Sequence, residues 1–322
     1  AGGMVSNAIG ATITGGSAGV LLADSTGIGA LVVNAGTITG GDGSLAGVGL
    51  SVVGGDLSVT NTADGVISGD LEGILGLSGG ADTIDNAGLI AATTTLPGAH
   101  QPVAGVFLFG DALVTNHAGG TISGTDIGVF VSGYSATVLN DGVIAGASRY
   151  GVALSAADST VVNTGSLSGG IAGVSLGYGG MLSNASAASI TGILASGAAA
   201  TIVNAGAVTT GAIYGDDTAT GTGYTLSGHG IALYGGGSIT NLAGASITGA
   251  VDGIITGGTD ATVENAGTVI GGTRAVYLNA QNNRLIIDPG AVFVGVVVAD
   301  TTTAANVLEL ASGASAGTLN GL

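Results

Sequence analysis

Residues 31–40 read LVVNAGTITG, and this stretch decides the fold. An alternating apolar run ends at Asn34, Gly36 follows in a turn, and a second alternating run is centred on Ile38. Related phrases recur at intervals of about 20 to 37 residues, which is the sequence signature of a solenoid. Each phrase carries one asparagine at the same place: Asn7, Asn34, Asn61, Asn86, Asn116, Asn140, Asn163, Asn184, Asn204, Asn241 and Asn265.

Each repeat contains three short runs with strand character. The first ends at the asparagine, the second follows the turn, and the third follows a glycine, as in Gly105-Val106-Phe107-Leu108. These runs are rich in β-branched residues and alternate with a period of two, which favours strands over helices. The sequence therefore predicts an all-β fold, a right-handed parallel β-helix (a β-solenoid) of about eleven to thirteen turns, or rungs, with three short strands each.

The second run of each repeat separates an inward side from an outward side. Its central Ile or Val is expected to point into the core, where such residues would stack at about 4.8 Å from rung to rung. The central residues are Ile13, Ile38, Ile67, Ile90, Ile122, Ile144, Ile190, Val208, Ile247 and Val269.

The asparagine and the glycine of the turn have separate expected roles. Stacked asparagine amides can donate to and accept from one another, which would build a hydrogen-bonded ladder along the rungs. The alternative is that each asparagine bonds only its own turn; recurrence at one position favours the ladder. The glycine, as in Gly36 or Gly119, is expected at a backbone position with positive φ.

The repeat pattern divides the chain into two parts. Residues 1–280 contain the β-helix repeats with Asn-x-Gly turns, and residues 281–322 continue the β-helix with altered rungs. In the second part, Asp288-Pro289-Gly290 is expected to form a turn between two apolar runs. The pattern breaks off in mid-rung at Leu322, so we expect a truncated piece of a longer chain.

Composition excludes several classes of partner. The 322 residues include 66 Gly, 20 acidic residues and no cysteine, and the formal net charge is −17. The basic residues are Arg149, Arg274 and Arg284, whereas a phosphate-binding surface needs clustered Lys and Arg. No apolar run approaches the roughly 20 residues of a membrane-spanning helix. We therefore expect no nucleic-acid partner, no membrane-embedded segment in this chain, and no cofactor or metal.

Several phrases resemble one known family. The repeats NAGTITGG from Asn34 and GVSLGYGG from Gly173, followed by NRLIIDPGAVFVGVV from Asn283 and NVLELASGASAGTL from Asn306, resemble the passenger region of autotransporters of Gram-negative bacteria. The resemblance implies export to the extracellular or outer-membrane surface and a β-helical stalk. It also implies anchoring through a C-terminal outer-membrane barrel outside these residues. Passengers of this family include adhesins, self-associating proteins and enzymes, so membership alone leaves the role open.

One constellation is a candidate for catalysis. Polygalacturonases are also β-helices, and pairs of Asp act there as acid and base. Asp216, Asp217 and His229 are similar to two motifs of these enzymes, but the Asn-Thr-Asp and Arg-x-Lys elements are absent. We therefore predict that the chain is not an enzyme, and keep these three residues as weak candidates. Local function is expected where the repeat is interrupted, at residues 93–102 and 216–228.

The outward residues of the second runs form a stripe of small hydroxyl side chains. An ice-binding surface would use such a stripe, but a packing surface for another copy is favoured, because low charge removes the usual protection against association. The pairs are Thr12/Thr14, Thr37/Thr39, Thr121/Ser123, Ser166/Ser168, Ser189/Thr191 and Ser246/Thr248.

The predicted function is that of a non-enzymatic, extracellular structural or adhesive β-helix, namely a stalk, adhesin or self-associating element. Its expected partners are other copies of itself, or glycans or proteins of a host or cell surface. The alternatives are a polysaccharide-acting enzyme on the same scaffold and a subunit of a surface filament or lattice.

Overall fold

The computed structural model describes residues 3–23, 29–41, 47–77, 79–94, 102–210, 228–299 and 305–313. The chain is an all-β solenoid of about 12 turns, in which strands of successive turns pair in parallel, so the predicted fold class is confirmed. Within the described ranges there is no helix long and apolar enough to cross a membrane.

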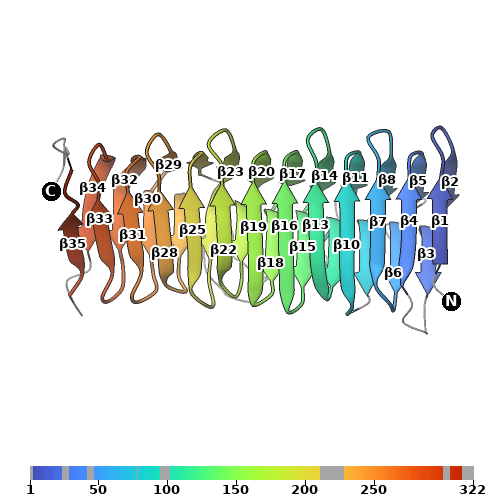
Figure 1. Cartoon of the computed structure of the whole chain (residues 1–322), viewed down its shortest axis with the longest axis horizontal. Helices are drawn as coiled ribbons and strands as arrows, with labels where there is room; N and C mark the ends of the chain where they lie inside the picture. Colours follow the sequence, from blue (N-terminus) through green and yellow to red (C-terminus); the bar gives the residue numbers. More distant parts are fainter. Residues whose placement is uncertain are drawn as a thin grey trace. The chain divides into compact units, whose positions relative to one another are not determined.

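Two compact units make up the chain. Unit 1 comprises Ala1–Asp158 and Gly165–Gly169, and unit 2 comprises Ser159–Thr164 and Gly170–Leu322. Within each unit, Figure 1 shows equivalent strands of successive turns lying side by side. Each turn contributes a first strand that ends at the asparagine, a second strand after the Asn turn, and a third strand.

Unit 1 has the three kinds of strand in regular alternation. Its first strands are β1 (Gly3–Asn7), β4 (Ala30–Asn34), β7 (Leu57–Asn61), β10 (Ala81–Asn86), β13 (Asp111–Asn116) and β16 (Ser135–Asn140). Its second strands are β2 (Thr12–Gly15), β5 (Thr37–Gly40), β8 (Val66–Gly69), β11 (Leu89–Ala92), β14 (Thr121–Gly124), β17 (Val143–Gly146) and β20 (Ser166–Gly169). Its third strands are β3 (Ala18–Ala23), β6 (Val48–Val53), β9 (Glu72–Leu77), β12 (Ala104–Phe109), β15 (Ile127–Ser132) and β18 (Tyr150–Ser155).

Unit 2 repeats this order and then changes it. Its first strands are β19 (Asp158–Asn163, of which residues 159–163 belong to this unit), β22 (Gly180–Asn184), β25 (Ala200–Asn204), β28 (Gly237–Asn241), β31 (Thr262–Asn265), β33 (Arg284–Ile287) and β35 (Val307–Leu310). Its second strands are β23 (Ser189–Thr191), β26 (Ala207–Thr209) and β29 (Ser246–Gly249), and its third strands are β21 (Ala172–Leu176), β24 (Ile193–Ala195), β27 (His229–Leu233) and β30 (Asp252–Thr256). Beyond them, the long strands β32 (Thr268–Leu278) and β34 (Val292–Ala299) each span the second and third positions.

The core is a set of apolar columns, because the register places equivalent residues directly above one another. Val32 pairs with Val59 in the first strands, and Ile38 pairs with Ile67 in the second strands. Every central Ile or Val predicted to point inward is fully buried except Ile13, which is half-buried in the first turn. One rung cannot enclose its own apolar face, so the stack supplies the burial.

The asparagines are joined by buried hydrogen bonds, and we call each series the Asn ladder. In unit 1, Nδ2 of each asparagine donates to Oδ1 of the next at 2.7–2.8 Å, through Asn7, Asn34, Asn61, Asn86, Asn116 and Asn140. In unit 2 the same bond, at 2.8–2.9 Å, runs through Asn163, Asn184, Asn204, Asn241 and Asn265.

The amide also bonds its own turn. Asn34 Nδ2 donates to the Gly36 carbonyl at 3.0 Å as well as to Asn61 Oδ1 at 2.8 Å. The two roles weighed from the sequence, ladder and local turn, are thus both present in one side chain. The two amide hydrogens make this possible.

The turn glycine has a different role from the predicted one. Gly36 does not have a positive φ. Instead, a Cβ at Gly36 would lie 2.2 Å from the Ala11 carbonyl oxygen and 2.7 Å from Asn7 Nδ2, so a side chain has no room there. The prediction of positive φ was therefore wrong for this short turn, where close approach of the preceding rung demands glycine. It holds in the longer turn, where Gly119 has a φ of +86°.

Strand pairing continues into residues 281–322 without the asparagine. β33 pairs with β31, and β35 pairs with β33, so Ile287 and Leu310 occupy the column that Asn265 occupies in the preceding turn. Leucine and isoleucine have no amide, so the described ladder ends at Asn265.

We predict that Asn61→Leu destabilises unit 1. The substitution leaves the buried Asn86 Oδ1 without its donor, whereas the Asn34 amide loses one acceptor but keeps the Gly36 and Val66 carbonyls. One orphaned buried group costs about 1–3 kcal/mol, so the free energy of unfolding should fall by about 2 kcal/mol, measured by urea unfolding followed by circular dichroism.

Thr60→Leu is the matched control, because Thr60 neighbours Asn61 in β7 but faces outward and is half-buried. Its effect should be within about 0.5 kcal/mol. Equal stability of the two variants would show that the ladder bonds contribute nothing.

Candidate functional sites

The structure places one of the three predicted catalytic candidates. Asp216 and Asp217 lie outside the described residues, as do residues 95–101 and 216–227 of the two interruptions. His229 is the first residue of β27 and is 8% exposed. Among the three candidates, His229 is therefore the one whose contacts the structure describes.

His229 lies in a column of charged side chains on neighbouring rungs. It pairs in register with Asp252 of β30, which pairs with Arg274 of β32. His229 Nδ1 lies 3.1 Å from Asp252 Oδ2. Arg274 donates Nε to Asp252 Oδ1 at 2.5 Å and Nη2 to Oδ2 at 2.8 Å, a bidentate pair. The Arg274 guanidinium also lies 3.9 Å from the centre of the Tyr277 ring.

Burial and neighbouring charge set the protonation of this cluster. The pKa of His229 is lowered, because burial disfavours the imidazolium and Arg274 repels it, although Asp252 favours it. The pKa of Arg274 is raised, chiefly by its hydrogen bond to Asp252. The fully buried Asp252 carboxylate is thus held by a guanidinium, beside a histidine whose neutral form is favoured. This is a compensated buried ion pair.

Asp252 and Arg274 were missed by the sequence reasoning, although a signal was present. The residue before the glycine of each third strand falls in one column, as Val48 and Glu72 do. Reading that position down the repeats gives mostly apolar residues, then His229 and Asp252 on adjacent rungs, with Arg274 next. The charged residues stand 22 and 23 positions apart and become neighbours only through the register.

Glu72 is a second buried acid in a third strand. It is 6% exposed and lies in register between Val48 and Ala104, both buried apolar residues. Burial raises the pKa of Glu72 from 4.5 to about 7, because the carboxylate loses its hydration. This side chain therefore titrates near neutrality.

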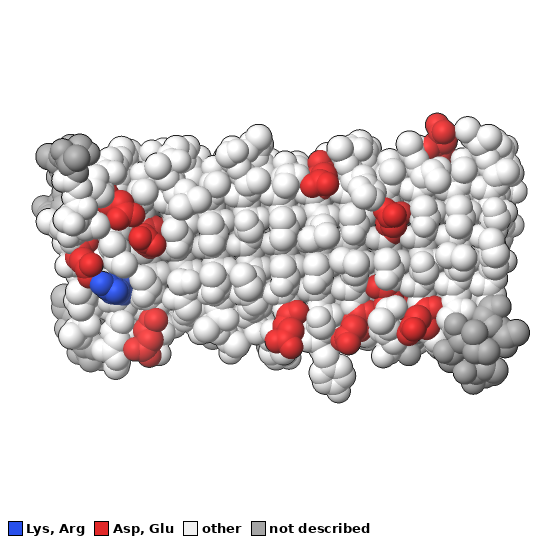
Figure 2. Space-filling model, viewed as in Figure 1, with Lys and Arg blue, Asp and Glu red and all other residues white. Residues whose placement is uncertain are grey.

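In unit 1, the outer faces of the first and second strands carry little charge, whereas the first strands of unit 2 carry Glu264, Arg284 and Glu309. Along the first strands of unit 1, Asp85 and Asp111 are the charged members of a half-buried or exposed set: Met4, Ser6, Leu31, Val33, Ser58, Thr60, Thr83, Asp85, Asp111, Leu113, Thr115, Thr137 and Leu139. Asp85 pairs with His117. Figure 2 shows the first-strand face largely white, with most acidic residues along its borders. The hydroxyl pairs of the second strands are also half-buried or exposed, so they face outward.

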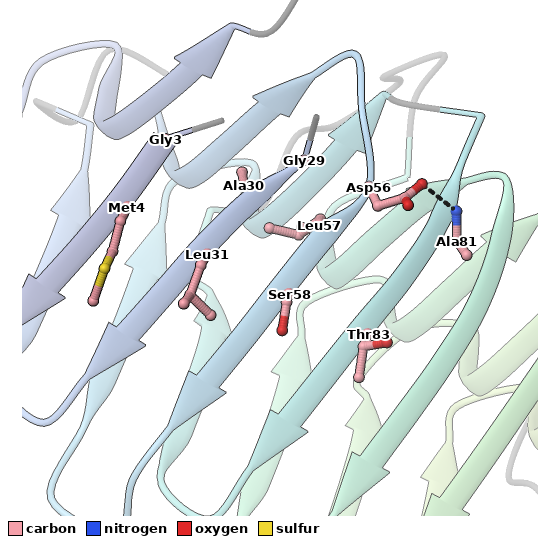
Figure 3. A pocket seen from close by; sticks show the side chains of 10 residues that line it. All are labelled: Gly3, Met4, Gly29, Ala30, Leu31, Asp56, Leu57, Ser58, Ala81 and Thr83. Carbon is pink, nitrogen blue, oxygen red and sulfur yellow. Dashed lines mark hydrogen bonds between the residues drawn. The ribbon is translucent and has the colours of Figure 1, made fainter. Parts of the chain in front are cut away.

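The first-strand face of unit 1 is hollowed near the start of its strands. The hollow has a volume of about 400 Å³, and Met4, Leu31, Ser58 and Thr83 project into it from neighbouring strands (Figure 3). Asp56 lies at its border, where its Oδ1 accepts a hydrogen bond from the Ala81 amide at 3.0 Å. The hollow is thus lined by the same mixture of apolar and hydroxyl side chains as the rest of the first-strand face.

Neither a metal-binding cluster among the described residues nor a match to a known protein assigns a function to this chain. Among the described residues, no group of three or more His, Cys, Asp or Glu side chains is placed to hold a metal ion. Comparisons with protein-family models, with curated proteins and with solved structures give no match to this sequence. The function must therefore be argued from the residues themselves.

We predict that Asp252→Asn strongly destabilises unit 2. The change leaves Arg274 without its carboxylate partner in a partly buried position, which should cost about 3 kcal/mol in the free energy of unfolding. The midpoint of urea unfolding measures this loss. Asp260→Asn, at an exposed turn position, is the control and should change stability by less than about 0.5 kcal/mol. Similar losses in both variants would contradict a special role for the Asp252 pair.

We predict that Glu72 makes unit 1 less stable as the pH rises. The folded pKa of about 7 exceeds the ordinary value of 4.5, so the folded state binds the proton more tightly. Its contribution is fully present below pH 4.5 and is lost as the pH rises through about 7, by up to about 3 kcal/mol.

Glu72→Gln should remove this dependence and leave the variant more stable than the parent at pH 8. Unfolding midpoints from pH 4 to pH 8 provide the measurement. Glu264→Gln, which removes a charge from the outer face of β31, should keep the dependence. Parallel pH profiles of the parent and the Glu72 variant would refute the assignment.

Proposed function

We propose that this chain is a non-enzymatic structural β-solenoid of the autotransporter-passenger type, which acts at the bacterial cell surface as a stalk or adhesive element that associates through its uncharged faces. The observation that carries the proposal is the scarcity of charge on the outer faces of the first and second strands of unit 1, where Asp85 and Asp111 are the charged residues of the first strands β1 to β16. A protein with net charge −17 that keeps charge off these faces leaves them suited to contact with another neutral surface.

The composition of the face supports self-association over recognition of a charged partner. Its exposed side chains include Met4, Leu31 and Leu113, at 71%, 39% and 38% exposure, interleaved with threonine and serine. Such a face loses little hydration when it is covered, and it has few charges that would need partners. Another copy of this chain presents the same kind of face.

The resemblance of the repeats to autotransporter passengers supports the cell-surface location. The phrase around Asn34 and the Asp288-Pro289-Gly290 turn carry that resemblance. A solenoid of parallel rungs is also consistent with a stalk, since each rung contacts only its neighbours and length can grow without a new core.

The His229 cluster supports a structural role more than catalysis. A general base must be free to take a proton, whereas both oxygens of Asp252 accept hydrogen bonds from Arg274. If the chain were instead a polysaccharide-acting enzyme, its one described candidate residue, His229, would lie beside Asp252, whose carboxylate is already bound by Arg274.

Sedimentation velocity across a dilution series tests the association. Raising the salt concentration should strengthen it, because salt screens the repulsion between copies of net charge −17 but does not weaken apolar contact. The double variant Leu31→Lys, Leu113→Lys places charge on the first-strand face and should weaken the association at least tenfold.

Ala63→Lys, Ala118→Lys is the matched control, since it adds the same charge at exposed positions in the Asn turns. It should associate as the parent does or slightly better. A parent that stays monomeric at every concentration and salt, or equal weakening in both double variants, would contradict the proposed surface.

A further inference from the structure

The chain has two methionines, and both lie on the surface. They are Met4 and Met181, and because the sequence has no cysteine, these two thioethers hold its only sulfur atoms. The exposed fractions are 71% for Met4 and 59% for Met181. Methionine is among the residues most often found fully buried, so the packing of the core does not explain this placement.

Both methionines occupy one position of the repeat, three residues before the ladder asparagine. Met4 lies in β1 and pairs in register with Leu31, which is also exposed. Met181 lies in β22, where Thr160 is its partner in the preceding rung and Thr201 in the following one. Met181 is thus exposed with a rung on either side, so its exposure follows from the outward direction of this position.

The surroundings of both thioethers are uncharged. In unit 1, Met4 projects into the hollow of the first-strand face, beside Leu31 and Ser58 (Figure 3). In unit 2, the half-buried or exposed side chains of β22, β25, β28 and residues 159–163 of β19 carry no charge. They are Thr160, Val162, Met181, Ser183, Thr201, Val203, Ser238 and Thr240. Each sulfur atom therefore lies on an uncharged part of the outer face.

We propose that Met4 and Met181 are modification sites for two-electron oxidants such as hydrogen peroxide, and that their oxidation weakens association through the first-strand face. The effect on association rests on the proposed function, whereas the reactivity of the two sulfur atoms does not. Each thioether takes up one oxygen atom from the peroxide and becomes a sulfoxide. The sulfur loses two electrons, the peroxide is reduced to water, and no main-chain bond changes.

The sulfoxide alters the face without altering the fold. Its oxygen is a hydrogen-bond acceptor that water solvates in the free chain, and contact with an apolar side chain removes this water without supplying a donor. Neither methionine belongs to the buried columns, so the core and the Asn ladder keep their contacts. The chain has no thiol, so reduction back to the thioether requires a dithiol from outside.

Peroxide treatment of the whole chain tests the sites and their effect separately. Intact-mass measurement should show two added oxygen atoms per chain, gained at a rate close to that of a free methionine peptide, because both thioethers are exposed. Sedimentation velocity should then show association weakened roughly tenfold or more. Incubation with methionine sulfoxide reductases A and B and a dithiol should restore it. Circular dichroism checks that the oxidised chain stays folded.

Two variants separate the face from oxidation in general, and each is compared with itself before and after peroxide. Met4→Leu, Met181→Leu removes both thioethers, so its association should not respond to peroxide. Adding Ala63→Met, Ala118→Met to that variant places two thioethers at exposed positions in the Asn turns. Peroxide should oxidise these methionines and still leave the association of this variant unchanged.

The outcomes distinguish this inference from the proposed function on which it rests. Slow oxidation of either methionine, or complete oxidation with unchanged association of the parent, would overturn the inference and leave the proposed function standing. Equal weakening by peroxide in the parent and in the leucine variant would overturn it as well. A parent that is monomeric before any oxidation would overturn the proposed function and, with it, the effect on association proposed here.

Discussion

The constraint on which this structure depends is parallel stacking in exact register. Every position of a rung lies above the same position of the rung before, at about 4.8 Å, so whatever one rung places in a column the next must tolerate. An amide such as Asn34 meets this condition because it is both donor and acceptor, and it completes its bonding with a copy of itself. A polar residue that could only donate or only accept would be left unsatisfied in the same buried column.

The same constraint explains the distribution of charge. Like charges in one column would lie a strand spacing apart and repel. The sheet faces therefore carry mostly threonine, serine and aliphatic residues, and an outward acid such as Asp85 has the uncharged Thr60 and Thr115 as its neighbours in register. The buried column that contains Asp252 also avoids like charges on adjacent rungs. Asp252 is followed in its column by Arg274, of opposite sign, and preceded by His229, whose pKa is lowered by burial, which favours the neutral imidazole. Glu72, between apolar residues, has its pKa raised toward neutrality.

The fold could be predicted from the sequence because its information is local and repeated. The run from Leu31 to Ile38 contains the strand, the turn and the core residue of one rung, and repetition implies the stack. The role of Gly36 could not be read in this way, because the atoms that exclude a side chain belong to the preceding rung. The partners of His229 were missed for a related reason: register between rungs of unequal length brings Asp252 and Arg274 to it, while attention to nearby sequence favoured Asp216 and Asp217.

Unequal rung length has a consequence of its own. Asn184 and Asn204 are 20 residues apart and Asn204 and Asn241 are 37 apart, yet both pairs make the same 2.8 Å bond. The bond therefore depends on the position of each asparagine in the cross-section of the solenoid. The number of residues between the two asparagines does not change it. Extra sequence can therefore be inserted between two strands without disturbing the columns above and below. A protein with this scaffold can therefore gain surface loops in single rungs, while the stacked columns of the core stay unchanged.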